Sequence, residues 1–436
     1  MSKVLIVTVG GSPAPIIKSI KDYQPAFIYF ICSKNPQGSE KTIDGPGDPC
    51  GDTRKAMCPQ CNEIFNLGNP KGKSIVVQCG LNENQYKVFT VENPDNLTEC
   101  YNSVDEIAQD VRKRFGPTYE VTANYTGGTK TMSVALAYYA CVKPEWKLGL
   151  NVGPRPDIIK VRAHDVFVTV NKTVVLVDYQ CERIRAALQN YDYSQAEKIF
   201  LSLLQEPLDN QNQQQLLNLQ RKIKGFNLWD HFRHEEALDL IQMHGSDFPQ
   251  YIVQLKEIMG KIKKSNPFAR VSDLLNNARR RAIQKRYDDA IARLYRATEM
   301  FAQVIMRIEY QLDSPNLLLK DLPTSELQEK YEAFMGKNSK LLLGLEKSYH
   351  LLADLEHKAG ELFMKNENRI LSALTKRNNS ILAHGETPLT EKDYLGVWDV
   401  LHDFLRDCSE KTGVDIKAQQ LPGEELLQGN LRHNKV

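Results

Sequence analysis

The chain has 436 residues, with 56 Lys and Arg against 54 Asp and Glu and a formal net charge of +2 at pH 7. This balance excludes a globally basic nucleic-acid coat and a globally acidic chain, so charge-driven binding must be local. Hydrophobic residues make up 42% and charged residues 25%, which is typical of a globular protein. The length suits about three domains or two large ones. No apolar run approaches the roughly 18 residues of a membrane span. Nine cysteines without a secretory signal predict a reducing cytoplasm as the location.

The first 180 residues alternate between strand and helix patterns. Short apolar runs predict strands at 3–9, 26–32, 74–78, 120–125, 148–152, 166–170 and 173–177. Helical periodicity occupies 13–23, 96–115 and 129–142. Continuous apolar strands separated by helices indicate an α/β fold with a parallel sheet buried on both faces. Lys172 lies between the last two runs, which we expect to form an antiparallel hairpin at the sheet edge.

Residues 35–73 interrupt this pattern with Gly, Pro, Cys and charged residues, and are interpreted as an insertion between strands. Cys58 and Cys61 form a CxxC knuckle, and Cys50 and Cys79 lie on either side of it. Four thiolates could hold a tetrahedral structural zinc ion. A second CxxC is missing, so free thiols are the alternative. Four sulfur ligands would leave no open position for catalysis.

From about residue 181 the pattern becomes helical. Residues 181–265 are interpreted as a helical connector, 266–412 as a second all-α domain and 413–436 as a polar tail that frays. The polar stretch 209–215 is expected to be a loop. Within 261–310, 12 Lys and Arg stand against 5 Asp and Glu, including Arg279–Arg281. This excess suits either a face that contacts RNA or an ordinary solvated helix face.

The most informative motif is 124–130 (NYTGGTK), at the end of an expected strand and the start of a helix. Gly127 and Gly128 let the backbone approach a ligand, Thr126 and Thr129 offer hydroxyls, and Lys130 offers a cation. With the free N–H groups of a helix N-terminus, these residues suit an anion or phosphate site. The Gly-x4-Gly-Lys spacing of a Walker A loop is missing. A tight, well-capped turn without a ligand is the alternative.

A second glycine turn, Gly10-Gly11-Ser12, follows the first strand and leads into a helix. Alone it is a weak signal, because many such turns only connect elements. Open α/β sheets bind ligands at the carboxyl ends of their strands, so two glycine loops at that edge reinforce each other. A GxGxxG sequence is absent, which disfavours a nicotinamide dehydrogenase.

Near the other end of the chain, Arg377 and Asn378 precede His384 by about two helical turns. A guanidinium can stabilise the charge of a scissile phosphate, an imidazole can move a proton near neutral pH, and Asn378 could orient either group. One histidine is short of an acid–base pair, and two copies facing each other across a dimer axis would supply the second. A surface arginine and a helix-terminal histidine without a catalytic role are the alternative.

Together, the two motifs resemble those of the CARF–HEPN effector ribonucleases of type III CRISPR systems. The 124–130 loop is similar to the NxTGGTK signature of CARF domains, and Arg377–His384 is similar to the R-x4-6-H signature of HEPN ribonucleases. The resemblance implies a Rossmann-like CARF sensor over about residues 1–180 and a helical HEPN domain over about 270–410.

The resemblance further implies a homodimer in which two CARF domains bind one cyclic oligoadenylate, of four or six adenylates. The implied ligand contacts are Gly10, Gly11, Ser12, Thr126, Gly127, Gly128, Thr129 and Lys130. Arg377, Asn378 and His384 of both chains would then cleave single-stranded RNA without a catalytic metal. Some CARF domains also cut their activator, and nothing in the sequence decides this here.

Two other functions stay open at this point. The chain could be a non-catalytic nucleotide sensor that regulates a partner, or a HEPN toxin of another defence system that senses a different nucleotide. A membrane partner is not expected.

Overall fold

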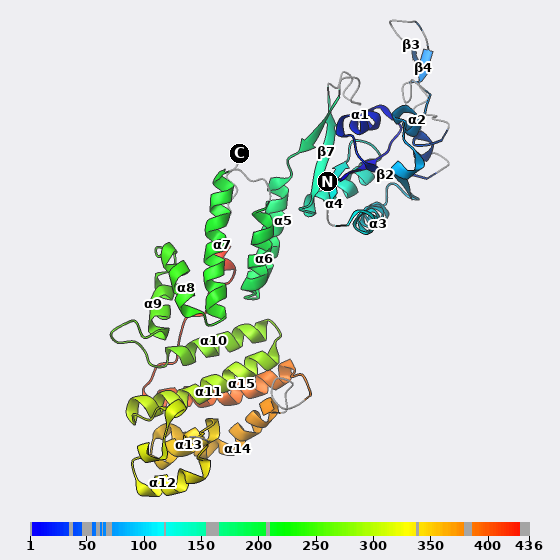
Figure 1. Ribbon diagram of the computed structural model, residues 1–436. Helices are drawn as coiled ribbons and strands as arrows, with labels where there is room; N and C mark the ends of the chain where they lie inside the picture. The colour runs from blue at the N-terminus through cyan, green and yellow to red at the C-terminus, as the bar shows by residue number, and fades with distance from the viewer. Residues whose placement is uncertain are drawn as a thin grey trace. The chain divides into compact units, whose positions relative to one another are not determined.

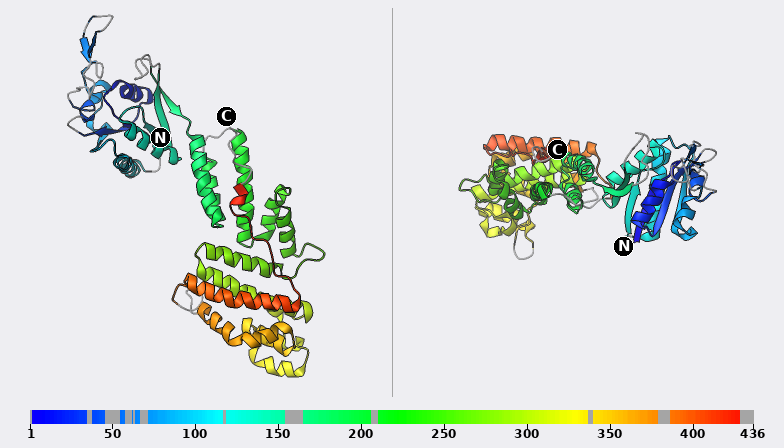
Figure 2. Two further views of the ribbon diagram at one scale, coloured as in Figure 1. Left: turned by 180° about the vertical axis from the view of Figure 1, so that it is seen from behind. Right: turned by 90° about the horizontal axis from the view of Figure 1, so that it is seen from above.

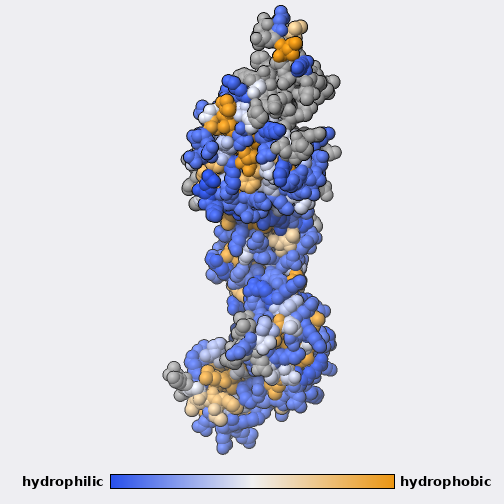
Figure 3. Space-filling model, turned by 90° about the vertical axis from the view of Figure 1, so that its right-hand side faces the viewer, coloured by the Kyte–Doolittle hydropathy of each residue, from blue (hydrophilic) through white to orange (hydrophobic). Residues whose placement is uncertain are grey.

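The computed structural model describes residues 2–34, 38–45, 55–57, 62, 64–66, 72–116, 119–153, 165–205, 210–336, 340–378 and 386–427. The chain divides into two compact units, the first covering Met1–Cys181 and the second formed mainly by Glu182–Leu204 and Asp209–Val436 (Figure 1). None of the described helices combines the length and the apolar character needed to cross a membrane. On the face drawn in Figure 3, hydrophilic residues dominate and hydrophobic residues gather in small, separate patches.

The first unit, called the sensor unit below, is built on a six-stranded sheet in the order β5-β2-β1-β6-β7-β8. Five strands run parallel and the edge strand β8 is antiparallel to β7. The strands are β1 (Ser2–Thr8), β2 (Phe27–Ser33), β5 (Tyr86–Val91), β6 (Tyr119–Asn124), β7 (Trp146–Val152) and β8 (Val166–Val170). A separate two-stranded ladder pairs β3 (Lys55–Met57) with β4 (Ile64–Asn66).

Helices cover both faces of this sheet. The helices are α1 (Ala14–Tyr23), α2 (Ile75–Cys79), α3 (Leu97–Phe115) and α4 (Lys130–Val142). Residues of α3 and α4 share one apolar core with the sheet, and residues of α1 and α2 share the other. Burial on both faces explains why the central strands are continuously apolar rather than alternating. The predicted α/β class is therefore confirmed.

Two expected strands are wrong. Residues 75–78 belong instead to the helix α2, because the Ser74 side chain caps it by accepting a hydrogen bond from the N–H of Val77, and Gly80 ends it in a left-handed conformation. Residues 173–177 open a longer helix, α5 (Thr173–Gln189). Its buried positions 176, 180, 181, 184 and 188 recur at helical spacing, which a five-residue window does not reveal. The antiparallel partner of β8 is therefore β7, not residues 173–177.

The second unit, called the helical unit below, continues from α5 with shorter helices and then a larger bundle. The first group is α6 (Tyr193–Leu203), α7 (Asn210–Asp230), α8 (His234–Ile241) and α9 (Pro249–Ile258). The bundle is α10 (Ala269–Ile283), α11 (Tyr287–Glu309), α12 (Ser325–Tyr331), α13 (Leu345–Asp354), α14 (Lys358–Asn378) and α15 (Glu391–Thr412). Helices α10, α11, α13, α14 and α15 share one apolar core, and Figure 2 shows this packing from behind.

Two expectations about irregular segments in this unit are also wrong. Helix α7 begins at Asn210, inside the stretch expected to be a loop. Residues 413–427 do not fray, because they pack across the helices. Tyr193 donates a hydrogen bond to the carbonyl of Pro422, and Asn276 donates to the carbonyls of Ala418 and Gln419. Leu421, Leu426 and Leu427 are buried, so the polar composition of this segment conceals a small apolar anchor.

Candidate functional site

The two glycine loops lie against each other at the carboxyl edge of the sheet. They follow β1 and β6, which are parallel neighbours in register from Ser2↔Tyr119 to Val7↔Asn124. The hydroxyl of Thr8 donates a hydrogen bond to the carbonyl of Gly127 over 2.6 Å. The structure therefore places the two glycine loops side by side at the carboxyl edge of the sheet.

Glycine is required at three positions of this contact. A Cβ on Gly127 would lie 2.3 Å from the carbonyl oxygen of Thr8, and a Cβ on Gly10 would lie 2.9 Å from the nitrogen of Gly128. Gly128 itself has φ of +81°, in the region that favours glycine. Backbone packs directly on backbone here, so the loop geometry tolerates no side chain.

The same loops present backbone donors. Within the described part of the chain, no hydrogen bond takes up the N–H groups of Gly127, Gly128, Gly11 or Ser12. Helix α4 starts at Lys130, whose side chain is exposed. Free N–H groups and the positive end of a helix dipole attract anions, and Lys130 adds a full positive charge. This edge can therefore bind a phosphate or another anion.

The hydroxyls of Thr126 and Thr129 have partners inside the protein. Thr126 donates to the side-chain oxygen of Asn124 over 2.5 Å and accepts from the N–H of Asn151 over 2.8 Å. Thr129 caps α4 by accepting from the N–H of Met132, and donates to the carbonyl of Pro94. Both threonines thus shape the loop, which leaves the backbone N–H groups and Lys130 as the groups open to a ligand.

A buried network that the sequence did not predict holds this loop. The amide of Asn124 donates to the Ser19 hydroxyl over 2.7 Å and to the Asn151 side-chain oxygen over 2.9 Å. The amide of Asn151 donates in turn to the carbonyl of Pro15 and to Asp165. Asn124 is 0% and Asn151 2% exposed, so water cannot reach their amides, and these hydrogen bonds satisfy groups that water would bind in the unfolded chain. Nothing in the sequence marks Asn151 as the partner of Asn124, because the two lie on different strands, β7 and β6.

The second candidate site lies on the last turn of α14. Arg377 is half-buried and its guanidinium lies 4.7 Å from the ring centre of Tyr295 on α11. Burial raises the pKa of Tyr295, and the arginine opposes that rise. Arg377 also donates to the side-chain oxygen of the exposed Asn378 over 3.2 Å. The tyrosine ring orients the guanidinium, and the sequence had not pointed to Tyr295.

His384 lies outside the described residues, which stop at 378 and resume at 386. The described residues on either side of this segment are anchored in the bundle. Lys376 forms an ion pair with Asp393 over 3.6 Å, and the N–H of Leu389 donates to Asp288 on α11 over 3.1 Å. The pairing of Arg377 with His384 stays a prediction.

Three of the four proposed zinc ligands, Cys50, Cys58 and Cys61, also lie outside the described residues. Cys79 is half-buried at the end of α2, and burial raises the pKa of its thiol. Metal binding would require the thiolate, and the zinc site stays a prediction.

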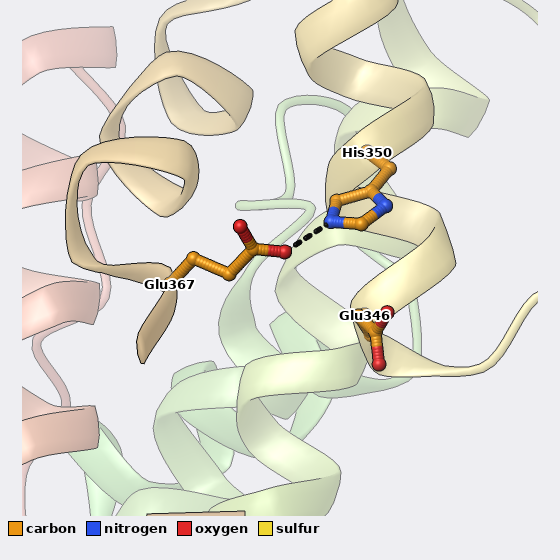
Figure 4. Close-up of side chains that lie close together, drawn as sticks. All are labelled: Glu346, His350 and Glu367. Atoms are coloured by element: carbon orange, nitrogen blue, oxygen red, sulfur yellow. Dashed lines mark hydrogen bonds and ion pairs between the residues drawn. The ribbon is translucent and has the colours of Figure 1, made fainter. Parts of the chain in front are cut away.

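Glu346, His350 and Glu367 form another group whose side-chain donors suit a metal, all within 4.8 Å of one another (Figure 4). His350 and Glu367 are joined by a 2.7 Å hydrogen bond between α13 and α14. Glu346 is paired with Lys347 over 2.9 Å. Each side chain therefore has a partner without a metal. The bond between His350 and Glu367 links the helices α13 and α14.

The arginine run 279–281 does not form a basic surface. Arg280 is 0% and Arg281 5% exposed, and both pair with the buried carboxylate of Asp230 on α7. Arg279 alone is exposed, with its guanidinium 4.9 Å from the ring centre of Trp398. Two of the three charges thus join α7 to α10 instead of facing solvent.

Comparisons with known proteins agree with this architecture. Residues 259–407 match the family model of the Csm6 HEPN domain. A search of curated proteins found no match. Among solved structures, Enterococcus italicus Csm6 bound to cyclic hexa-2'-fluoro-hexa-dAMP is 15% identical in sequence. The alignment covers 99% of this chain and 98% of that one, with a TM-score of 0.52. The C-terminal part of this chain thus matches the Csm6 HEPN domain, and the chain as a whole has the fold of the Enterococcus italicus Csm6 structure.

Proposed function

We propose that this protein is an endoribonuclease of type III CRISPR defence that a cyclic oligoadenylate activates. The observation that carries the proposal is the family match over 259–407, which includes Arg377 and the position of His384. The anion site at the sheet edge supplies the sensor that such a nuclease requires. The proposed location is the cytoplasm, where RNA and a nucleotide second messenger both occur.

The activator would bind through its phosphates to the glycine loops. The unbonded N–H groups of Gly11, Ser12, Gly127 and Gly128 support this role, together with the exposed Lys130. A ring-shaped ligand with rotational symmetry suits a homodimer, in which two copies of this loop pair line one pocket. The solved Csm6 structure contains a cyclic analogue with six nucleotides. For this chain, cyclic tetra-adenylate and cyclic hexa-adenylate are both candidate activators.

Cleavage would use the side chains at the end of α14. A ribose 2′-hydroxyl of single-stranded RNA attacks the adjacent phosphorus, and the bond to the 5′-oxygen breaks to leave a cyclic phosphate. Arg377 stabilises the charge that develops on the phosphoryl oxygens, and His384 transfers a proton. Asn378, bonded to Arg377, orients that guanidinium. Two chains supply two histidines, so the chemistry needs no catalytic metal. A zinc ion on Cys50, Cys58, Cys61 and Cys79 would be structural.

The experiment is cleavage of a fluorescent single-stranded RNA in EDTA, with and without each adenylate ring. Cleavage that depends on one ring supports the proposal and identifies the ring size. His384→Ala should abolish cleavage, whereas His231→Ala, at an exposed histidine bonded to its own helix, should not.

Two alternatives give different results in the same assay. A non-catalytic sensor binds a ring but cuts nothing, with or without His384. A HEPN toxin of another system cuts RNA only with a different nucleotide, which a panel of cyclic and linear nucleotides would reveal. Conversion of the cyclic activator to a linear product during the assay would show that the protein degrades its activator.

A further inference from the structure

Lys172 marks the point where the chain leaves the sheet of the sensor unit. It follows β8 and directly precedes α5, and its side chain is buried, with 9% of the residue exposed. Helix α5 begins in the sensor unit and ends in the helical unit, since the division at Cys181 falls within Thr173–Gln189. The contacts that fix the Lys172 side chain therefore also fix the first turn of α5, the helix that leads from one unit into the other.

The ammonium of Lys172 is bound to the carboxyl end of α4. It donates to the carbonyls of Ala140 over 2.8 Å and Pro144 over 3.3 Å, and to the carbonyl of Lys143. Carbonyl oxygens are suitable acceptors for the N–H groups of an ammonium. Ala140 lies in the last turn of α4, whose free carbonyls form the negative end of the helix dipole, and Lys143 and Pro144 follow that end directly. A buried cation is stable here because the helix terminus replaces its water.

Helix α4 links this contact to the proposed activator site. Its first residue is Lys130, at the glycine loop, and its 13 residues span about 20 Å to the end that Lys172 holds. Most of its inward side, including Leu136 and Tyr139, is packed in the core of the sensor unit. A helix is stiff along its axis, so a displacement of the loop end reaches the far end with little loss.

We propose that Lys172 couples activator binding to the nuclease by fastening the end of α4 to the start of α5. An anion at the N-terminus of α4 moves this helix, and Lys172 carries the movement to α5, which continues along the chain into the helical unit. The inference rests on the proposed function, and it specifies the route by which the two sites communicate. The thermodynamic requirement is that the ligand binds more tightly to the active arrangement of these helices.

A structural role alone would have a different signature. If Lys172 only caps α4, its loss destabilises the sensor unit, and activator binding and activation decline together. If it couples the sites, binding persists while activation is lost. The test therefore requires affinity and activity to be measured on the same protein.

The variant is Lys172→Met in the full-length chain, which keeps the apolar stem and removes the ammonium. Ring binding is measured by calorimetry, and RNA cleavage is measured with and without saturating ring. We expect affinity within about threefold of wild type and an activation ratio reduced at least about tenfold. Lys172→Arg, which keeps the charge and the donors, should restore part of the activation. Lys143→Met is the matched control, because the Lys143 ammonium lies over the Tyr139 ring at the same helix end.

Equal activation of Lys172→Met and wild type would overturn the inference and leave the proposed function intact. A wild-type protein that binds no ring would overturn both. Hydrogen exchange on wild type provides a test that no folding defect can obscure. Ring binding should change amide exchange in 140–145 and in 173–180, and unchanged exchange in the second segment would also overturn the coupling role.

Discussion

The anion site of the sensor unit and the Arg377 site of the helical unit are built in opposite ways. The first presents backbone N–H groups, and its side chains mostly hold the loop in shape. The second presents side chains on a regular helix, and its backbone is ordinary. A backbone-built site should therefore tolerate a change of side-chain chemistry and fail when a Cβ is added. A site built from side chains should do the reverse.

The largest expected effect is on the helical side of this comparison. Arg377→Ala removes the group that stabilises phosphoryl charge, and RNA cleavage should fall on the order of 10²–10³-fold. Ring binding should not change, since Arg377 belongs to the bundle. Cleavage kinetics at saturating ring, with calorimetric binding as the control, measure both. If this variant cleaved RNA at the wild-type rate, Arg377 would not be a catalytic residue.

The next largest effect should come from Gly127→Ala in the sensor unit. The new Cβ would lie 2.3 Å from the carbonyl oxygen of Thr8, so the loops must separate. Overpacking of this kind costs about 1–3 kcal/mol, and we expect ring affinity to fall at least about tenfold. Calorimetry on the purified variant measures it.

Gly344→Ala is the control for that substitution, because nothing lies within 4 Å of its Cβ and its φ is −72°. It should bind the ring as wild type does. Unchanged affinity in Gly127→Ala would contradict a ligand site built on the two loops.

A smaller effect is expected from Asn151→Ala, which removes the centre of the buried network. The amide of Asn124 loses one of its two acceptors while it remains buried, and an unsatisfied buried group costs about 1–3 kcal/mol. The unfolding transition of the sensor unit in denaturant measures its stability, and calorimetry measures its affinity for the ring. Loss of stability without loss of ring affinity would show that the network does not position the loop.

The smallest effect should be at Thr129. Thr129→Val keeps the shape and removes the helix cap, at a cost of about 1 kcal/mol. Thr129→Ser keeps the hydroxyl and should behave as wild type in thermal unfolding. If Thr129→Val instead abolished ring binding without loss of stability, the hydroxyl would contact the ligand directly.

Much of the sensor fold could be predicted because buried parallel strands are apolar throughout and their helices are amphipathic. The expectation failed where short segments were ambiguous. Residues 173–177 are β-branched and apolar, and only the later positions of α5 establish its helical period. Residues 86–91 form the edge strand β5, in place of the predicted strand at 74–78. Edge strands are partly exposed, so their pattern is weaker.

The site residues show the same division. The glycine loops could be found in the sequence because glycine and a helix start are local signals. Tyr295 under Arg377, and Asn151 behind the loop, lie 82 and 27 residues from the groups that they hold. Nothing local distinguishes them from other tyrosines and asparagines.

The sequence by itself determined the fold class, the two motifs and their order along the chain, because each depends on neighbouring residues and on periodicity. The tertiary structure decided which polar groups are already bonded and which stay open. It placed Lys172 at the end of α4 and buried Arg280 and Arg281 against Asp230. Such contacts join segments that are distant along the chain, and burial then gives a charge or an amide its energetic weight.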